Sequence, residues 1–291
     1  MSGHHDAAPG PNAAATLKAD KTEKIAVLGG GVMGETILAG ILAAGWSGDQ
    51  VVLSERRAEV AQRMAERHGV LIGDSNADTV AGSNVVVLAV KPQDVDALIT
   101  EITPSLDSSA LIISVAAGLS TQWFEQRLPG GQPVVRVMPN TPAVVGEGMS
   151  AISGGAHTSG EHLRLTEELL AKTGRVMQVP EKQQDAVVGI SGSGPAYVFY
   201  VADALSEAGV LLGLTRDDAR ELAVQTLLGA ATLLRETGDH PALARERVSS
   251  PGGTTIAALR ELDERGVRAA MIAAAKAAHD RSVELGTELG K

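Results

Sequence analysis

The 291-residue sequence has no cysteine, an aromatic share of only 2% and fewer basic than acidic side chains. Without cysteine the chain has no disulfides, thiolate nucleophiles or Cys-ligated metals, which fits a reducing compartment such as the cytoplasm. Its 25 basic and 35 acidic residues give a net charge of −10, and aromatics for base stacking are scarce, so we expect no nucleic-acid partner. Its apolar runs are far shorter than the roughly 20 residues that span a bilayer, and we expect no membrane segment.

The chain also lacks a metal-binding pattern and a secretion signal. Residues 1–22 are rich in Ala, Gly and Pro and contain no apolar segment, so they indicate a disordered tail. The later histidines lack the i, i+4 pairing beside a carboxylate that zinc peptidases use, and we predict no metal site; they are His68, His157, His162, His240 and His279.

Between residues 24 and 179, short β-branched runs alternate with helical stretches. The runs are apolar on both faces, as in a parallel sheet that helices cover on both sides; they are Ile25–Leu28, Gln50–Leu53, Val85–Val90, Leu111–Val115 and Val134–Val137, followed by Met149–Ile152 and Arg175–Val179. The predicted helices include Gly34–Ala44, Ala58–His68, Thr121–Leu128 and Glu161–Thr173. Residues 23–180 therefore predict a doubly wound α/β domain.

From residue 181 to 291 the strand pattern stops and Ala-, Leu- and Glu-rich helical patterns take over. The predicted helices are Gly194–Leu212, Arg216–Glu236, Gly252–Leu262 and Val267–Leu285. Small residues at helical spacing, such as Ala269, Ala273 and Ala277, permit close contacts between helices. Because this half has few large apolar side chains for a core of its own, we expect it to pack against a second subunit.

A glycine motif follows the first predicted strand directly and opens a helix. It reads Gly29-Gly30-Gly31-Val32-Met33-Gly34, which is the G-x-G-x-x-G pattern of dinucleotide-binding domains. The first glycine permits the tight turn, the second lets the backbone approach a pyrophosphate, and the third lets the helix pack on the strand. Its position after a strand favours a cofactor loop over a plain glycine turn.

The end of the second predicted strand carries conflicting signals about the cofactor. Glu55 stands where an acidic residue accepts hydrogen bonds from the ribose of NAD, whereas Ser54, Arg56 and Arg57 offer donors to the 2′-phosphate of NADP. We favour NADPH, provided that Glu55 turns outward, and keep NADH as the second option. The two arginines also fit the start of a solvated helix face.

Three further loops follow predicted strands at the edge where open α/β sheets bind ligands. Lys91 either lies near cofactor phosphate or ribose or is an ordinary surface lysine, and Pro92 suits the first turn of the next helix. Ala117 and Asn140 follow the next two strands. Small residues in these loops admit a nicotinamide ring, although ordinary turn chemistry also explains them.

Two serine- and glycine-rich motifs mark the helical half. Ser191-Gly192-Ser193-Gly194-Pro195-Ala196-Tyr197 predicts a helix that Ser193 caps, and its small residues also suit a ligand approaching the backbone. Ser249-Ser250-Pro251-Gly252-Gly253-Thr254-Thr255 precedes another helix, whose free N–H groups and neighbouring hydroxyls suit a carboxylate. A plain helix N-cap explains the second motif equally well.

Taken in order, these motifs make the chain resemble the pyrroline-5-carboxylate reductase family. The matching segments are IAVLGGGVMGETILAGIL, VVVLAVKP, VVRVMPNTPAVVGEGM, DAVVGISGSGPAYVF and VSSPGGTTIAALRELDERGVR, which together span the chain from about Lys24 to Leu285. Many dehydrogenases share the glycine motif, whereas SGSGPAY and SPGGTT behind it are much more specific.

The resemblance implies an N-terminal Rossmann domain, a C-terminal helical dimerisation domain and hydride transfer from NAD(P)H to the C=N carbon of 1-pyrroline-5-carboxylate, the last step of proline biosynthesis. It implies that Thr255 bonds the ring nitrogen of this substrate, as the candidate catalytic residue. Ser250, Gly252, Gly253 and Thr254 would hold its carboxylate, and the cofactor would contact Gly29–Gly34, Ser54, Arg56, Lys91, Ala117 and Asn140. Family members dimerise through their helical domains and often form rings, so we expect a homodimer and consider a ring of dimers.

Two other functions remain open. A dehydrogenase of the 3-hydroxyacid type resembles this layout, but it relies on a helical-domain lysine, and here only Lys182, Lys276 and Lys291 occur. A non-catalytic NADP-binding regulator would keep the glycine loop but has no need of SPGGTT. No role is assigned to Arg247, which stands just before that segment.

Overall fold

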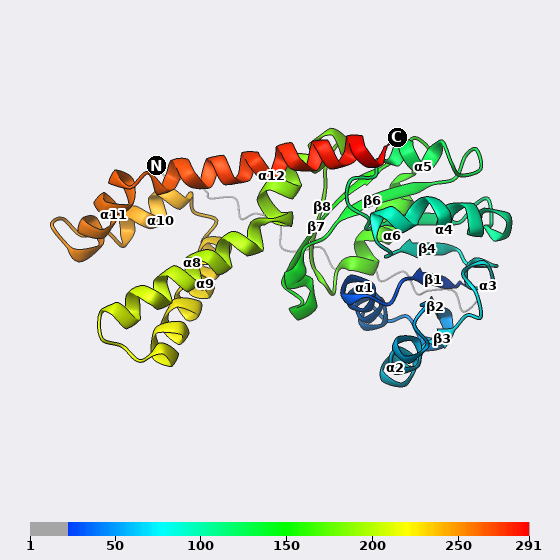
Figure 1. The fold of residues 1–291 in the computed structure, drawn as a ribbon, viewed down its shortest axis with the longest axis horizontal. Coiled ribbons are helices and arrows are strands. Elements are labelled where there is room, and N and C mark those ends of the chain that lie inside the picture. Colours follow the sequence, from blue (N-terminus) through cyan, green and yellow to red (C-terminus); the bar gives the residue numbers. More distant parts are fainter. Residues whose placement is uncertain (1–22, 291) are drawn as a thin grey trace, which may run out of the picture.

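The computed structural model describes residues 23–290, and the predicted disordered tail, residues 1–22, lies outside the described residues. A sheet domain and a long helical arm make up the chain (Figure 1). The strands are β1 (Ile25–Leu28), β2 (Val51–Ser54), β3 (Leu71–Ile72), β4 (Val85–Leu88), β5 (Leu111–Ser114), β6 (Val134–Met138), β7 (Gly148–Gly154) and β8 (Gly174–Gln178). The helices of the sheet domain are α1 (Val32–Ala43), α2 (Ala58–His68), α3 (Asn76–Val80), α4 (Val95–Ile102), α5 (Thr121–Glu125) and α6 (Gly160–Leu170).

The helical arm follows β8 and contains the remaining helices. They are α7 (Gln184–Val187), a π-helical turn (Val188–Gly192), α8 (Gly194–Leu211), α9 (Arg216–Thr237), α10 (Pro241–Arg247), α11 (Thr254–Glu264) and α12 (Val267–Leu289). Short elements such as β3, α3 and α10 were not predicted, because a few residues carry too little periodicity to be distinguished from loop. None of the helices described is long and apolar enough to span a membrane.

The eight strands form one sheet in the order β3-β2-β1-β4-β5-β6-β7-β8. The strands from β3 to β6 run parallel, β7 is antiparallel to β6, and β8 is parallel to β7. The reversal at β7 follows from its short connection, residues 139–147, because a parallel return needs a longer crossover. The predicted fold class, a doubly wound sheet followed by an all-helical part, is confirmed.

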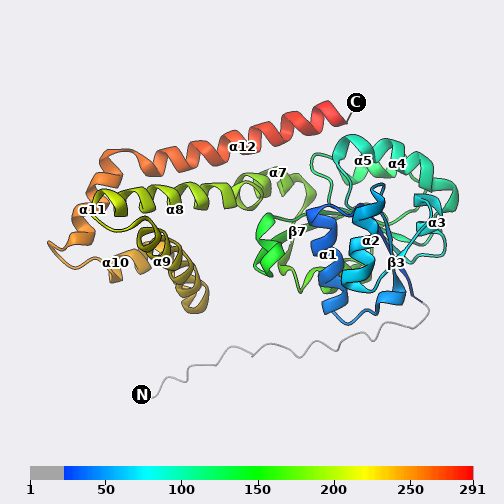
Figure 2. The same ribbon diagram turned by 60° about the horizontal axis from the view of Figure 1, so that its bottom comes forward.

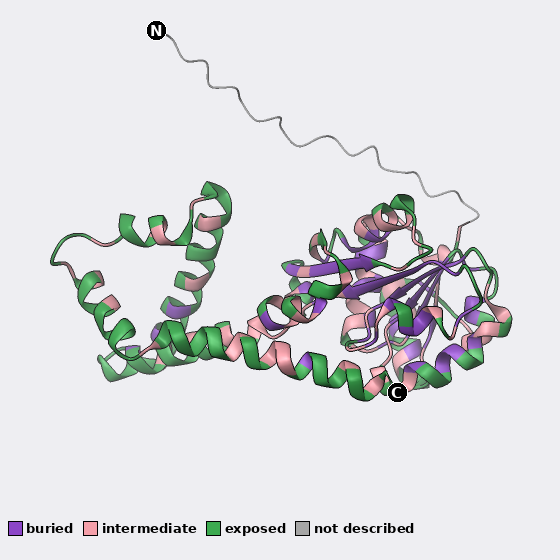
Figure 3. Ribbon diagram, turned by 90° about the horizontal axis from the view of Figure 1, so that it is seen from above, coloured by how far each residue is buried: buried purple, intermediate pink, exposed green. Residues whose placement is uncertain are grey.

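Alternate side chains of each central strand enter the two cores of the sheet domain. Ile25 and Val27 of β1 pack with Leu38 of α1 and Met64 of α2 on one face. On the other face, a second core joins side chains of β1, β4 and β5 with those of α4 and α5; its largest fully buried members are Leu28, Leu88, Ile99, Ile102 and Phe124. The buried sheet stands out from the largely exposed arm in Figure 3.

The helical arm has almost no buried core of its own. Among the residues described, its only buried apolar side chains are Ala219 and Ala223, at the contact between α8 and α9. Large apolar side chains instead face outward, with Phe199 65%, Leu211 87% and Ile272 65% exposed. Burying such surface is the main driving force of protein association, so we expect another protein surface to pack against the arm.

Helix α12 returns from the far end of the arm to the sheet domain, as Figures 1 and 2 both show. Near its middle, a Cβ on Gly189 of the π-helical turn would stand 2.7 Å from the carbonyl oxygen of Ala275, so glycine permits this close approach. At its end, Leu289 comes within 3.1 Å of where a Cβ of Gly118 would lie, in the loop after β5. The arm is therefore held to the sheet domain at α7, the π-helical turn and the last turns of α12.

Candidate functional site

The loops that carry the predicted cofactor residues lie side by side at one edge of the sheet. The strand register pairs Leu28 with Ser54 and with Leu88, and pairs Leu88 with Ser114. Each of these residues ends its strand, so the following loops meet at the carboxyl edge. A cavity of about 580 Å³ opens there, between the loops after β1, β2 and β4. This is the edge at which open α/β sheets bind their ligands.

The glycine loop has the geometry of a pyrophosphate site. Gly29 has a positive φ of 108°, and a Cβ on Gly34 would lie 2.0 Å from the carbonyl oxygen of Gly29, so α1 packs directly on the loop. A Cβ on Gly31 would meet nothing within 4 Å, because this glycine faces the cavity. Gly31 is also the N-cap of α1 and no side chain caps the helix, which leaves the first N–H groups of α1, from Val32 onward, available to an anion.

Replacement of the two glycines by alanine should separate packing from binding. We expect Gly34→Ala to lower the free energy of unfolding by about 3 kcal/mol, because the added methyl group clashes with the backbone. Gly31→Ala should change it by less than about 1 kcal/mol while weakening the binding of NAD(P)⁺, because the methyl group enters the cavity. Urea unfolding and ligand titration measure the two effects, and equal destabilisation by both substitutions would contradict this assignment.

The Glu55 carboxylate turns inward, toward the glycine loop. Gly30 N–H donates to it at 2.8 Å, and Arg57 donates from its backbone N–H at 3.0 Å, from Nε at 2.9 Å and from Nη2 at 3.1 Å. The side chain of Glu55 is only 8% exposed. The expectation that Glu55 turns outward is therefore wrong, because the N–H of Gly30 and the Arg57 guanidinium hold its charge inside the site. The Arg57 guanidinium is therefore paired with the Glu55 carboxylate.

These hydrogen bonds make Glu55 an unusually strong acid. The Arg57 side chain, with help from the N–H groups of Arg57 and Gly30, lowers the pKa of Glu55 from 4.5 to about 2. Its ionised form thus stabilises the folded chain at pH values above 4.5, and this contribution is lost as the pH falls toward 2. We expect Glu55→Gln to remove roughly 3 kcal/mol of unfolding free energy at pH 7 and much less at pH 3, as urea unfolding at both pH values would show. Equal losses at both pH values would contradict it.

Other donors at this end of the cavity are also partly engaged. The Ser54 hydroxyl donates to Asn76 Oδ1 at 2.7 Å, and Asn76 donates to Glu101 at 2.9 Å. Sequence reasoning missed Asn76, which lines the cavity from α3. The signal was a polar residue shortly after a strand, but β3 has only two residues and was not predicted.

Besides Arg57, the exposed cations of the cavity are Arg56 and Lys91. The side chain of Arg56 is 82% exposed and forms an ion pair with Asp94 at 3.4 Å. Lys91 is exposed and caps the short 3-10 turn Pro92–Asp94, in which Pro92 occupies the first position. Both line the cavity beside the glycine loop. The predicted cofactor residues of the first three strand ends are therefore brought together.

Ala117 and Asn140 extend the same edge toward the helical arm. Ala117 is exposed in the loop after β5. Asn140, after β6, donates to the carbonyl oxygen of Ser191 at 3.0 Å and accepts from Met149 N–H at 2.8 Å. Asn140 also borders a cavity of about 450 Å³, largely apolar, whose other wall is the arm; it is lined there by Ile190, Tyr197, Phe199, Leu227 and Met271. Asn140 thus ties the sheet edge to the arm.

Helix α8 begins at Gly194 with Ser193 at its N-cap position, as predicted, but the predicted cap by the Ser193 side chain is wrong. The chain is already helical from Gln184, and the π-helical turn leads directly into α8. Ser193 makes no side-chain cap hydrogen bond. The five-residue π-helical turn is held by hydrogen bonds such as that from Tyr197 Oη to the carbonyl oxygen of Gly189 at 3.2 Å. Such turns interrupt helices frequently at functional sites, and periodicity does not reveal them.

The segment that resembles a carboxylate site forms a tight turn before α11. Gly253 N–H donates to the carbonyl oxygen of Ser250 at 3.0 Å, and Gly252 has a positive φ of 66°, as a turn with Pro251 in its second position requires. The helix begins at Thr254, two residues later than predicted, because this turn occupies the preceding residues. No side chain caps α11, so its first N–H groups, including that of the half-buried Thr255, remain available to an anion.

This turn and the glycine loop are not brought together within one chain. The turn lies at the start of α11, at the end of the arm far from the sheet domain, whereas the last turn of α12 contacts Gly118 of the sheet domain (Figures 1 and 2). Helix α12, whose 23 residues correspond to about 34 Å, runs from that part of the arm to the sheet domain. Arg247, just before the turn, forms an ion pair with Asp239.

Comparisons with known families match both parts of the chain. Residues 181–285 match the family described as pyrroline-5-carboxylate reductase dimerisation. Residues 24–118 match the family described as NADP oxidoreductase, coenzyme F420-dependent.

Comparisons with individual proteins extend over nearly the whole chain. The pyrroline-5-carboxylate reductase of Corynebacterium melassecola is 45% identical over 265 residues, covering 90% of this chain and 98% of the relative. A solved pyrroline-5-carboxylate reductase from Coxiella burnetii superposes with a TM-score of 0.86 at 35% identity, covering 91% of this chain and 98% of that one. The Plasmodium falciparum pyrroline carboxylate reductase, solved with NADP bound, has a TM-score of 0.81 at 27% identity, with 91% and 98% covered.

Proposed function

This chain belongs to the pyrroline-5-carboxylate reductase family, and we propose from that premise that it reduces 1-pyrroline-5-carboxylate to L-proline with NAD(P)H. The observation that carries the proposal is the pairing of an open glycine loop at the sheet edge with an uncapped, glycine-preceded helix start in the arm. The first suits a pyrophosphate and the second a carboxylate, which are the charged groups of the two reactants.

The residues at the sheet edge fit a dinucleotide. The glycine loop and the start of α1 would hold the pyrophosphate, because Gly31 is open to the cavity and the first N–H groups of α1 are uncapped. Arg56 and Lys91 offer exposed positive charge along the same cavity. Ala117, small and exposed after β5, leaves room for the nicotinamide, and Asn140 holds the adjoining loop in place.

The residues before α11 fit the substrate. The N–H groups around Gly252, Gly253 and Thr254, together with the Ser250 hydroxyl, would hold its carboxylate, as the uncapped helix start permits. The Thr255 hydroxyl would bond the ring nitrogen. These assignments rest on the turn geometry and on the family motif that the segment matches.

A partner subunit is needed to complete this site. Within one chain the α11 turn lies at the far end of the arm, which α12, about 34 Å long, joins to the sheet domain, whereas hydride transfer requires reacting atoms roughly 3–3.5 Å apart. The outward-facing apolar side chains of the arm provide the surface for a homodimer. We therefore propose that the α11 turn of one subunit covers the sheet edge of its partner, with rings of dimers as a further level of assembly. A monomer mass that does not change with concentration would contradict it.

Alignment is the main contribution of the chain to the reaction. A bound reduced nicotinamide supplies the hydride for the imine carbon. The start of α1 would hold the cofactor and the start of α11 the substrate. Holding both reactants in place removes most of the entropic cost of their encounter. Thr255 orients the ring nitrogen. We infer that the proton on this nitrogen is already present on binding or arrives through water, because a hydroxyl is a weak acid.

NADPH is proposed as a cofactor together with NADH. With Arg57 held by Glu55, Arg56 and Lys91 are the exposed cations left for a 2′-phosphate, whereas the Glu55 carboxylate is placed to accept from an unmodified ribose.

The direct test is oxidation of NADPH and NADH by the purified chain in the presence of 1-pyrroline-5-carboxylate. We expect turnover that requires both reactants and produces L-proline, with Gly31→Asp as the inactive control because it places a negative charge where the pyrophosphate binds. No turnover with either cofactor would overturn the proposal.

A further inference from the structure

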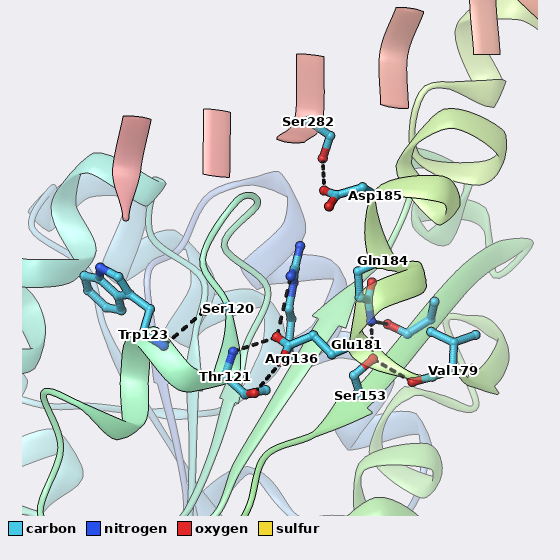
Figure 4. Close-up of polar contacts among 11 residues, drawn as sticks. Ser120, Thr121, Trp123, Arg136, Ser153, Val179, Glu181, Gln184, Asp185 and Ser282 are labelled. Carbon is cyan, nitrogen blue, oxygen red and sulfur yellow. Dashed lines mark hydrogen bonds and ion pairs between the residues drawn. The ribbon is translucent and has the colours of Figure 1, made fainter. Parts of the chain in front are cut away.

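A separate polar cavity lies between the sheet domain and the last turns of α12 (Figure 4). Its volume is about 370 Å³, and it shares no lining residue with the cavity at the glycine loop. One wall belongs to α5, β6 and α7, and the opposite wall is α12; the polar side chains that line it include Ser120, Gln122, Arg136, Asp185, Ser282 and Thr287. None of these residues takes part in the reaction proposed above.

Arg136 places a buried cation in this cavity. Its side chain is only 8% exposed, and its one ion pair joins Nη1 to Glu181 Oε1 at 3.5 Å. That carboxylate is already engaged, because Thr121 donates to it from its N–H at 2.6 Å and from its hydroxyl at 2.5 Å. Within residues 23–290 the guanidinium donates no hydrogen bond, so its N–H groups are left for an occupant of the cavity. Among the residues described, the guanidinium nitrogens are not enclosed by protein and so are open to the cavity, and the planar fork of a guanidinium matches a carboxylate.

Asp185 places a negative charge at the α12 side of the same cavity. Its Oδ1 accepts from the Ser282 hydroxyl at 2.6 Å, and no other contact of its carboxylate is found in the part of the chain described. Figure 4 shows the Arg136 guanidinium extending from β6 toward Asp185 and Ser282. In the part of the chain that the structure describes, the two charges nevertheless form no ion pair with each other, so space remains between them. The carbonyl end of α12, at Gly286 and Thr287, adds partial negative charge on that side.

We infer that this cavity binds a small free amino acid, with its carboxylate on Arg136 and its ammonium group at Asp185. A zwitterion matches both charges, whereas a simple anion leaves Asp185 repelling it and a simple cation leaves Arg136 unmatched. The ligand would join β6 and α7 to α12 and so would fix the arm on the sheet domain. It would also border Gly118, which directly follows the proposed nicotinamide residue Ala117.

Tryptophan fluorescence provides a direct test without cofactor or substrate. The chain has two tryptophans, and Trp123 lines the cavity, so Trp46→Phe leaves a single reporter at the site. We expect at least one of the common L-amino acids to change this emission saturably. Its analogues without the amine or without the carboxylate, and inorganic phosphate, should bind at least tenfold more weakly. Thermal unfolding of the same protein should shift upward with the bound amino acid.

Variants of both charges identify the site. In the Trp46→Phe background, Arg136→Met should abolish the change and Asp185→Asn should weaken binding at least tenfold, whereas Arg175→Met, an exposed arginine on β8, should have no effect. Should Arg136→Met fail to fold because Glu181 loses its partner, the double variant Arg136→Gln/Glu181→Gln replaces it. The variant Asp185→Asn then tests the site independently. The inference is overturned if no amino acid gives a saturable change, if phosphate binds as tightly, or if Asp185→Asn behaves like Arg175→Met.

Discussion

A mixture of two inactive variants is expected to recover about a quarter of the wild-type activity when they are produced together, because their subunits pair at random. One variant is Thr255→Ala, which removes the proposed bond to the substrate ring nitrogen. The other is Gly31→Asp, which blocks the glycine loop. A site made from the glycine loop of one subunit and the α11 turn of the other is intact once in every mixed dimer, because both defects fall in the opposite site.

The two variants alone should fail in different ways. We expect Thr255→Ala to lower kcat/KM by about 100-fold while leaving the dissociation constant of the cofactor nearly unchanged, because a buried hydrogen bond to a charged group is lost. Gly31→Asp should prevent cofactor binding without unfolding the chain, since its position is open. Thr100→Ala, an exposed threonine on α4, is the matched control and should behave like the wild type.

Recovery of activity decides between two arrangements. If each active site were built within a single chain, every site in the mixture would carry one defect and the activity would stay at the level of the variants alone. That result would contradict the proposed exchange between subunits. Unchanged kcat/KM for Thr255→Ala would separately contradict its role at the ring nitrogen.

Replacement of Glu55 is expected to change the choice of cofactor by at least about tenfold in favour of NADP⁺ over NAD⁺, because a fixed charge near a phosphate contributes several kcal/mol at short range. Glu55→Gln removes the negative charge that a 2′-phosphate would meet and releases the Arg57 guanidinium to pair with it. Binding of NAD⁺ should weaken at the same time, since the ribose loses its charged acceptor.

The measurement is the dissociation constant of each oxidised cofactor, obtained by titration calorimetry. Glu59→Gln is the matched control, because Glu59 is exposed in the first turn of α2 only four residues away. An unchanged ratio of the two dissociation constants in Glu55→Gln, or an equal shift in Glu59→Gln, would contradict the assignment. Because the pKa of Glu55 is about 2, the preference should not titrate with this carboxyl between pH 5 and 8.

The first half of the site could be predicted because its signals are local. The glycine motif directly follows a strand that is apolar on both faces, and the same few residues that make the turn also begin α1. Ser193 was misread for the opposite reason. The Ser–Gly–Pro pattern is the same whether the chain before the helix is irregular or already helical. Here the preceding chain is a π-helical turn, so the serine side chain has no open helix end to cap.

The orientation of Glu55 was also beyond local reasoning. Arg57, two residues away, donates three hydrogen bonds to this side chain, but the fourth, from Gly30, forms only once β1 and β2 are paired, and it draws the carboxylate to the glycine loop. Asn76 was missed because it reaches the cavity from the helix after a two-residue strand. In both cases the deciding neighbour, Gly30 for Glu55 and Ser54 for Asn76, lies far away in the sequence, so spacing along the chain carries no information about it.

The sequence by itself determined the family, the fold class, the position of the glycine loop and the need of the helical half for a covering surface. These follow from periodicity, from glycines that only certain backbone shapes require, and from a shortage of large apolar side chains. The tertiary structure alone decided that the glycine loop and the α11 turn lie in different parts of the chain, in the sheet domain and at the far end of the arm, that Glu55 faces the glycine loop, and that Arg136 and Asp185 face one cavity. The physical reason is that helix direction and strand pairing set distances in space, and motif order along the chain does not contain them.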